Sequence, residues 1–154
     1  MKKFVVVITA LTLVSIFACK KDDDLTRTDL LCSGPWRLNE STFNPPFQHE
    51  GGSIVDRYLL ALPPCAKDDI WIFNKSGTYK IDEGTSKCDN SDYELYQVGI
   101  WGFDDTEEYL YKAHLFFYDE YQILNLNQTE LQVSWIWQPD TISIYNIIDT
   151  YIHP

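Results

Sequence analysis

The chain has 154 residues, of which 45% are hydrophobic and 15% aromatic, so it is long and apolar enough for one domain with its own core. Its formal net charge is −11 at pH 7, and removal of an N-terminal signal containing Lys2, Lys3 and no acid takes it to −13. A surface this acidic repels phosphate groups, which excludes nucleic acid as an expected partner and argues against binding anionic lipid by charge alone.

Residues 1–18 have the pattern of a secretory signal. Met1-Lys2-Lys3 precedes an uncharged apolar run, FVVVITALTLVSIF, which is shorter than the about 20 residues of a membrane span. The ending Ile16-Phe17-Ala18-Cys19 resembles the lipobox of bacterial lipoproteins, although Phe17 is bulkier than is usual there. The resemblance implies that Cys19 is lipidated and anchors the protein to the membrane. The alternative is an ordinary cleaved signal with an incidental cysteine.

Residues 19–29 are expected to form a flexible tether, because KKDDD and LTRTD have almost nothing to bury. The acidic cluster after Cys19 also resembles the surface-export signal of Bacteroidetes lipoproteins. That resemblance implies an outer-membrane protein exposed at the cell surface. The alternative is a solvated linker without address information, in which case the protein could face either the periplasm or the cell surface.

The stretch from Cys65 to Cys88 is predicted to be a β-hairpin with a disulfide across its base. A short apolar run, Ile70–Phe73, is followed by the turn Asn74-Lys75-Ser76-Gly77 and by an alternating run, Thr78–Asp82. Both faces of the first arm are expected to be buried, and one face of the second to be wet.

The remaining domain, residues 30–154, is rich in strand formers. Residues 43–53, with two prolines and two glycines, are predicted to be a loop, and residues 54–62 one short helix ended by Pro63-Pro64, with a strand as the alternative. Turns are expected at Asp119-Glu120 and at Pro139-Asp140, among other places. The strands beside the hairpin arms are predicted at Trp36–Leu38, Gln97–Phe103, Tyr109–Tyr118, Tyr121–Leu126, Glu130–Gln138 and Thr141–Tyr151.

Eight strands at short, regular spacing, with at most one short helix, predict an all-β fold, a barrel or a sandwich. The series GPWRL, CAKDDIWIFNKSGTY, GIWGF, YQILNL and LQVSW resembles the lipocalin-like lipoproteins of Bacteroidetes over about residues 30–150. This resemblance implies a small antiparallel meander barrel in which Trp36 plugs one end. It says little about function, because such barrels carry unrelated activities.

Three cysteines remain once Cys19 is assigned to lipid. Cys65 and Cys88 flank the hairpin and are expected to pair, which for a loop of this length contributes roughly 3.5 kcal/mol in the chain-entropy model. Cys32 is then left as a buried small residue, with exchange for another cysteine or an intermolecular bond as alternatives. Zinc is not expected, because there is no close cysteine pair and the histidines stand alone.

No catalytic residue, metal site or cofactor site is predicted. Nucleophile elbows and phosphate loops are missing from the sequence, and a calcium site from Asp82, Glu83, Asp89 and Asp92 lacks the regular loop spacing, so solvated turn acids are favoured. His114 lies on the same strand face as Lys112 and is expected to be an exposed or rim residue and not a base.

The candidate ligand-binding residues are aromatic, because small barrels can hold one ligand in their interior. They are Trp71, Trp101, Tyr111, Trp135 and Trp137, with the alternative that these rings merely fill the barrel. Tyr109, Tyr111, Tyr118 and Tyr121 are alternatively an exposed stacking surface.

The sequence therefore predicts a non-enzymatic, lipid-anchored envelope module for a small apolar or amphipathic molecule. The alternative is a surface module with a filled barrel, an accessory subunit or inhibitor, that binds an envelope protein or a glycan.

Overall fold

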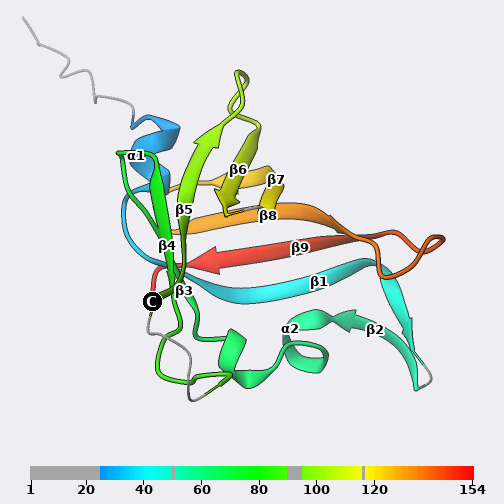
Figure 1. Ribbon diagram of the computed structural model, residues 1–154. Helices are drawn as coiled ribbons and strands as arrows, with labels where there is room; N and C mark the ends of the chain where they lie inside the picture. The colour runs from blue at the N-terminus through cyan, green and yellow to red at the C-terminus, as the bar shows by residue number, and fades with distance from the viewer. Residues whose placement is uncertain (1–24, 50, 90–94, 116) are drawn as a thin grey trace, which may run out of the picture.

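The computed structural model describes residues 25–49, 51–89, 95–115 and 117–154 (Figure 1). The predicted signal peptide, Cys19 and the tether up to residue 24 lie outside the described residues. A nine-stranded antiparallel sheet accounts for most of this part of the chain.

The strands follow one another around the sheet in chain order, apart from β2. They are β1 (Trp36–His49), β2 (Gly52–Asp56), β3 (Ile70–Phe73), β4 (Thr78–Asp82), β5 (Leu95–Phe103), β6 (Tyr109–His114), β7 (Phe117–Leu126), β8 (Glu130–Trp137) and β9 (Tyr145–Ile152). β1 pairs with β3 on one edge and with β9 on the other, which closes eight strands into a barrel. β2 pairs only with β1 and projects beyond the ring. This is the up-and-down, lipocalin-like arrangement, and the predicted fold class is confirmed.

The helices are short. They are α1 (Arg27–Leu31), α2 (Arg57–Leu60) and one 3₁₀ turn, η1 (Pro64–Ala66). Thr26 caps α1 through a reciprocal contact with Asp29, and the helix brings the fully buried Leu31 against the barrel. The predicted tether therefore ends earlier than residue 29, because the cap at Thr26 and the buried Leu31 fix the helix to the domain.

The barrel interior has two apolar clusters. The first lies beside α1 and contains Trp36, whose ring is fully buried and whose indole nitrogen donates to the Leu31 carbonyl at 2.8 Å. The second gathers Phe43, Tyr145 and Ile147 with the side chains of the β1–β2 hairpin. Along β9, Asp149 stands between Tyr151 of the first cluster and Ile147 of the second, so a polar layer separates the two.

The prediction of a loop at residues 43–53 is wrong. β1 continues to His49 and β2 follows, and Figure 1 shows this hairpin as a long arm beyond the ring. Pro45 and Pro46 lie in the irregular stretch between the pairs Thr42↔Asp56 and Phe47↔Ile54, where a missing N–H interrupts no regular ladder.

The predicted helix at residues 54–62 is reduced to the four residues of α2. β2 takes Ile54 and Val55, and Asp56 caps α2 by accepting a hydrogen bond from the Leu59 amide. Short apolar runs of this kind fit a strand or a helix equally well, so pairing with β1 decides.

The turn predicted at Asp119-Glu120 is also misplaced. β6 ends at His114 and β7 begins at Phe117, so both acids lie within a strand. Leu115 adopts a left-handed backbone with φ of 49°. A leucine carries no turn signal in sequence, so the apolar run concealed the bend. β9 similarly begins at Tyr145, because Asp140 accepts backbone hydrogen bonds from Ile142 and Ser143 and extends the preceding turn.

Candidate functional site

The barrel wall opens between β7 and β8. Pairing of these strands runs from Gln122↔Ser134 to Leu126↔Leu131. Before Gln122, the residues of β7 pair with β6 alone, and from Trp135 onward β8 pairs with β9 alone. The two strands therefore diverge, and a cleft of about 890 Å³ lies between them.

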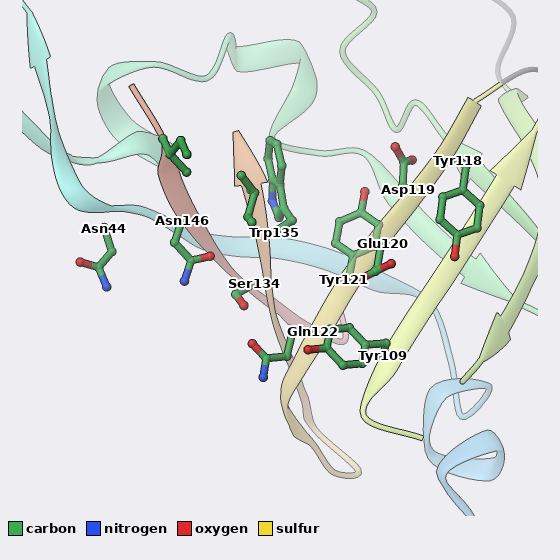
Figure 2. Close-up of a pocket in the computed structure, with 12 residues that line it drawn as sticks. Asn44, Tyr109, Tyr118, Asp119, Glu120, Tyr121, Gln122, Ser134, Trp135 and Asn146 are labelled. Carbon is green, nitrogen blue, oxygen red and sulfur yellow. The ribbon is translucent and has the colours of Figure 1, made fainter. Parts of the chain in front are cut away.

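Both faces of the sheet contribute to this cleft. In Figure 2, Asn44 and Asn146 lie on one side, Tyr121 and Tyr118 on the other, and Trp135 between them. Strand alternation places Trp135, Asp119 and Tyr121 on the inner face, and most of the remaining lining on the outer face. The full lining is Asn44, Tyr109, Tyr118, Asp119, Glu120, Tyr121, Gln122, Ser134, Trp135, Ile136, Ile144 and Asn146.

Lys112 lies inside the barrel, directly behind the cleft. It is 2% exposed, and its Nζ is 3.6 Å from the ring centroid of Trp71 and 4.8 Å from that of Tyr121. Burial lowers the pKa of Lys112 from 10.5 to about 8, against the opposing charges of Asp119 and Asp149. Lys112 lies on the same inward face of β6 as Leu110 and thus places a cation among aromatic rings.

Asp149 is the matching anion. Its carboxylate accepts hydrogen bonds from the Ser41 hydroxyl and, at 2.8 Å, from the indole nitrogen of Trp135. Arg57 from α2 lies 3.5 Å from the same carboxylate and covers the Trp135 ring at 5.3 Å. Burial raises the pKa of Asp149, while these hydrogen bonds and the nearby cations oppose the rise. The network fixes the orientation of Trp135 at the cleft.

The five predicted ligand-binding aromatics do not gather at one place. Trp71 belongs to the first apolar cluster and Trp137 packs on the second. Trp101 lies against Phe73 and Phe103, and its indole nitrogen donates to the Asn74 carbonyl. Tyr111 stacks on Tyr118, with ring centroids 5.4 Å apart. Of the five, Trp135 lines the cleft.

The charged residues of the interior were missed by the sequence prediction. Lys112, which the sequence indicates only as sharing a strand face with His114, is fully buried. His114 is half-buried at the end of β6, where its ring stacks on Phe117 and lies 3.2 Å from the Tyr79 hydroxyl. The two-residue period of strands could have predicted these buried charges. Lys112 alternates in step with the buried Leu110, and Asp149 in step with the buried Ile147.

The cysteine pairing is confirmed, because Cys65 and Cys88 form a disulfide. Cys32 is a half-buried free thiol, and burial raises its pKa. In the part of the chain that the structure describes, no group of three or more His, Cys, Asp or Glu side chains is arranged to hold a metal ion. Asp92 of the conceivable calcium set lies outside it.

The described helices include none that is long and apolar enough to cross a membrane.

The fold and the cleft together define a class of protein, the small lipocalin-like barrel that can serve as a module for a small ligand.

Comparison with known proteins adds little to this assignment. No protein-family model matches the chain, and no curated protein matches it either. Among solved structures, a deswapped triple mutant of bovine odorant-binding protein superposes with a TM-score of 0.42 and 16% identity over 79% of this chain and 72% of that chain. The fold assignment rests on strand order and closure, and this superposition carries no part of it.

Proposed function

We propose that the protein is a non-enzymatic binding module whose ligand is a small amphipathic molecule held in the cleft between β7 and β8. The observation that carries this proposal is the divergence of the two strands, which leaves a cleft of about 890 Å³ leading toward the polar layer of the barrel. Sites of this volume suit small molecules.

The lining supports an amphipathic ligand over a purely apolar one. Trp135 and the tyrosines offer flat apolar surfaces, whereas Asn44, Gln122 and Asn146 offer amide donors and acceptors. A ligand with one apolar or aromatic part and one or two polar groups satisfies both kinds of surface.

A second candidate ligand is a glycan, favoured by the position of Tyr109 and Tyr118 beside the amides on the outer face of the sheet. Rings of this kind stack on flat apolar surfaces, and the amides bind hydroxyl groups. A glycan would remain largely outside the barrel wall, whereas the amphipathic molecule would contact Trp135.

The binding experiment titrates purified protein with naphthalenemethanol, an amphipathic aromatic probe, by calorimetry. We expect Trp135→Phe to weaken binding about five- to tenfold, because the indole supplies ring surface and is held by Asp149. Trp101→Phe is the matched control, since Trp101 does not line the cleft. Equal weakening in both variants, or no saturable binding, would contradict the proposal. Competition by oligosaccharides alone would favour the glycan.

The envelope location belongs to the same proposal and is supported by the lipobox-like sequence ending at Cys19. Lipid attachment at Cys19 would hold the domain at the outer membrane, with the cleft free to sample solutes on the side to which the protein is exposed. We expect labelled palmitate to enter the wild-type protein in bacterial cells but not Cys19→Ser. Equal labelling of both would remove this part of the proposal.

A further inference from the structure

The Nζ of Lys112 belongs to a buried side chain and is surrounded mainly by aromatic rings. An ammonium carries three donors, yet its one ion pair in this part of the chain is with Asp119 at 3.9 Å. The rings of Trp71, Tyr121 and Tyr79 surround it at 3.6, 4.8 and 5.4 Å. The side chain is only 2% exposed, so it meets little bulk water.

This amine lies one side chain away from the cleft. Asp119 and Tyr121 are the contacts of Nζ on β7, and both also line the cleft (Figure 2). Asp119 is 41% exposed, which shows that solvent reaches the residue directly beside Nζ. Lys112 is not itself a lining residue, so a ligand group reaches the amine by passing beside Asp119 and Tyr121.

The surroundings of Lys112 make the neutral, nucleophilic form of its amine more accessible than in an exposed lysine. Desolvation lowers the pKa to about 8, and the acids Asp119 and Asp149 only partly oppose it. The other titratable groups facing this region are Tyr79 and Tyr121, whose pKa values are raised by burial, so both stay neutral near pH 8. By contrast, the side chain of Lys75 is 66% exposed, and hydrogen bonding to Asp29 raises its pKa.

We propose that the ligand of the cleft carries an aldehyde or ketone group and that Lys112 captures it as a reversible imine. This inference rests on the proposed function and names the chemical class of the ligand. The Nζ lone pair attacks the carbonyl carbon, a C–N bond forms, and the carbonyl oxygen leaves as water with the two amine hydrogens. No oxidant or reductant takes part.

The geometry suits this reaction better than a simple ion pair. A bare anion entering the cleft would meet Asp119, and Asp149 beyond it, as well as the lysine. A carbonyl group is neutral, so these acids do not exclude it. Tyr121 and Trp135, which line the cleft, provide ring surface for the apolar remainder of the ligand.

The test uses naphthaldehyde and, as a matched probe without a carbonyl, naphthalenemethanol. Purified full-length protein is incubated with substoichiometric naphthaldehyde at pH 8 and then treated with borohydride, which reduces an imine to a stable amine. We expect one adduct, heavier by the mass of the aldehyde less one oxygen atom, and peptide mapping should place it on Lys112. Labelling of Lys112→Met should fall at least tenfold. Lys80→Met, which removes a lysine from the outer face of β4, should label like the wild type.

The mapping of the wild-type adduct decides the question even if Lys112→Met folds poorly. Adducts spread over exposed lysines with Lys112 unlabelled would overturn the inference. If both probes bind saturably but no adduct forms, the imine is excluded and the proposed function stands. If neither probe binds in calorimetry and no adduct forms, the proposed function fails with it.

Discussion

Lys112 and Asp149 place opposite charges inside a barrel whose other buried residues are mostly aromatic and aliphatic. Buried charges of this kind cost stability unless they are paired and hydrogen-bonded. Asp149 is well provided for, with Ser41, Trp135 and Arg57 as partners. Among the described residues, Lys112 has cation–π contacts with aromatic rings and one long ion pair. We therefore expect its burial to lower the free energy of unfolding.

At the residue scale, we expect Lys112→Met to stabilise the protein. A lysine whose pKa falls from 10.5 to about 8 on folding costs up to about 3 kcal/mol at neutral pH, and lost cation–π contacts with Trp71 offset part of the gain. The unfolded state binds the proton more tightly, so the cost is fully present below about pH 8 and disappears as the pH rises towards 10.5.

Urea denaturation of both proteins at pH 7 and near pH 10 measures this difference. Comparing the two proteins removes the shared titration of Tyr79 and Tyr121. The stability advantage of the methionine variant should shrink at the higher pH. A constant advantage, or a variant less stable at pH 7, would contradict the assignment of Lys112 as a costly buried cation.

At the scale of elements, the short helices position side chains that no strand of the sheet brings to the barrel interior. α2 is only four residues long, yet it delivers Arg57 to Asp149 and across the Trp135 ring. α1 packs against the end of the barrel that contains Trp36. The backbone carbonyl of Leu31, the last residue of α1, accepts a hydrogen bond from the indole nitrogen of Trp36. Sequence periodicity predicted neither helix correctly, because segments this short carry too few turns to show a period.

The Cys65–Cys88 disulfide joins the segment before β3 to the segment after β4. Replacing both cysteines by serine should lower the free energy of unfolding by about 3.5 kcal/mol, because the unfolded chain regains the entropy of an open loop. Cys32→Ser is the control and should change it by less than about 1 kcal/mol, since that thiol is unpaired in the described residues. Denaturant midpoints at constant m-value test this, and equal effects of the two changes would contradict it.

At the scale of the whole molecule, closure is uneven around the barrel. β1 pairs with β9 from Arg37↔Ile152 to Asn44↔Asn146, whereas β7 and β8 separate beyond Gln122↔Ser134. Gly99 marks a close approach between β5 and β6, where an added Cβ would lie 2.1 Å from the Ala113 carbonyl oxygen. The described wall is therefore closed between β1 and β9 and open between β7 and β8.

Hydrogen exchange should report this asymmetry. Amides in the paired stretch of β1 and β9 should exchange slowly, and those of residues 117–121 that point toward β8 should exchange quickly, because these β7 residues have β6 as their only paired neighbour. Saturation with naphthalenemethanol should slow exchange in the β7 segment and leave β1 and β9 unchanged. Uniform protection of β7 along its length would argue against the opening.

Local sequence patterns predicted the all-β class, the hairpin at residues 70–82 and the pairing of Cys65 with Cys88, and the structure confirms all three. These depend on local alternation and on cysteine spacing, which need no knowledge of distant neighbours. The hairpin pattern also predicted a buried Trp71, and the family resemblance implied a buried Trp36; both are buried in the structure.

Only the tertiary structure decided where the barrel opens and what lies behind the opening. The divergence of β7 from β8, the meeting of Lys112 with Trp71, and the approach of Arg57 to Asp149 each join residues distant in sequence. A strand shows which of its side chains share a face, but not whether that face meets water or another strand. Closure of β1 onto β9 settles this, because it turns inward-facing positions of every strand, charged ones included, into one shared interior.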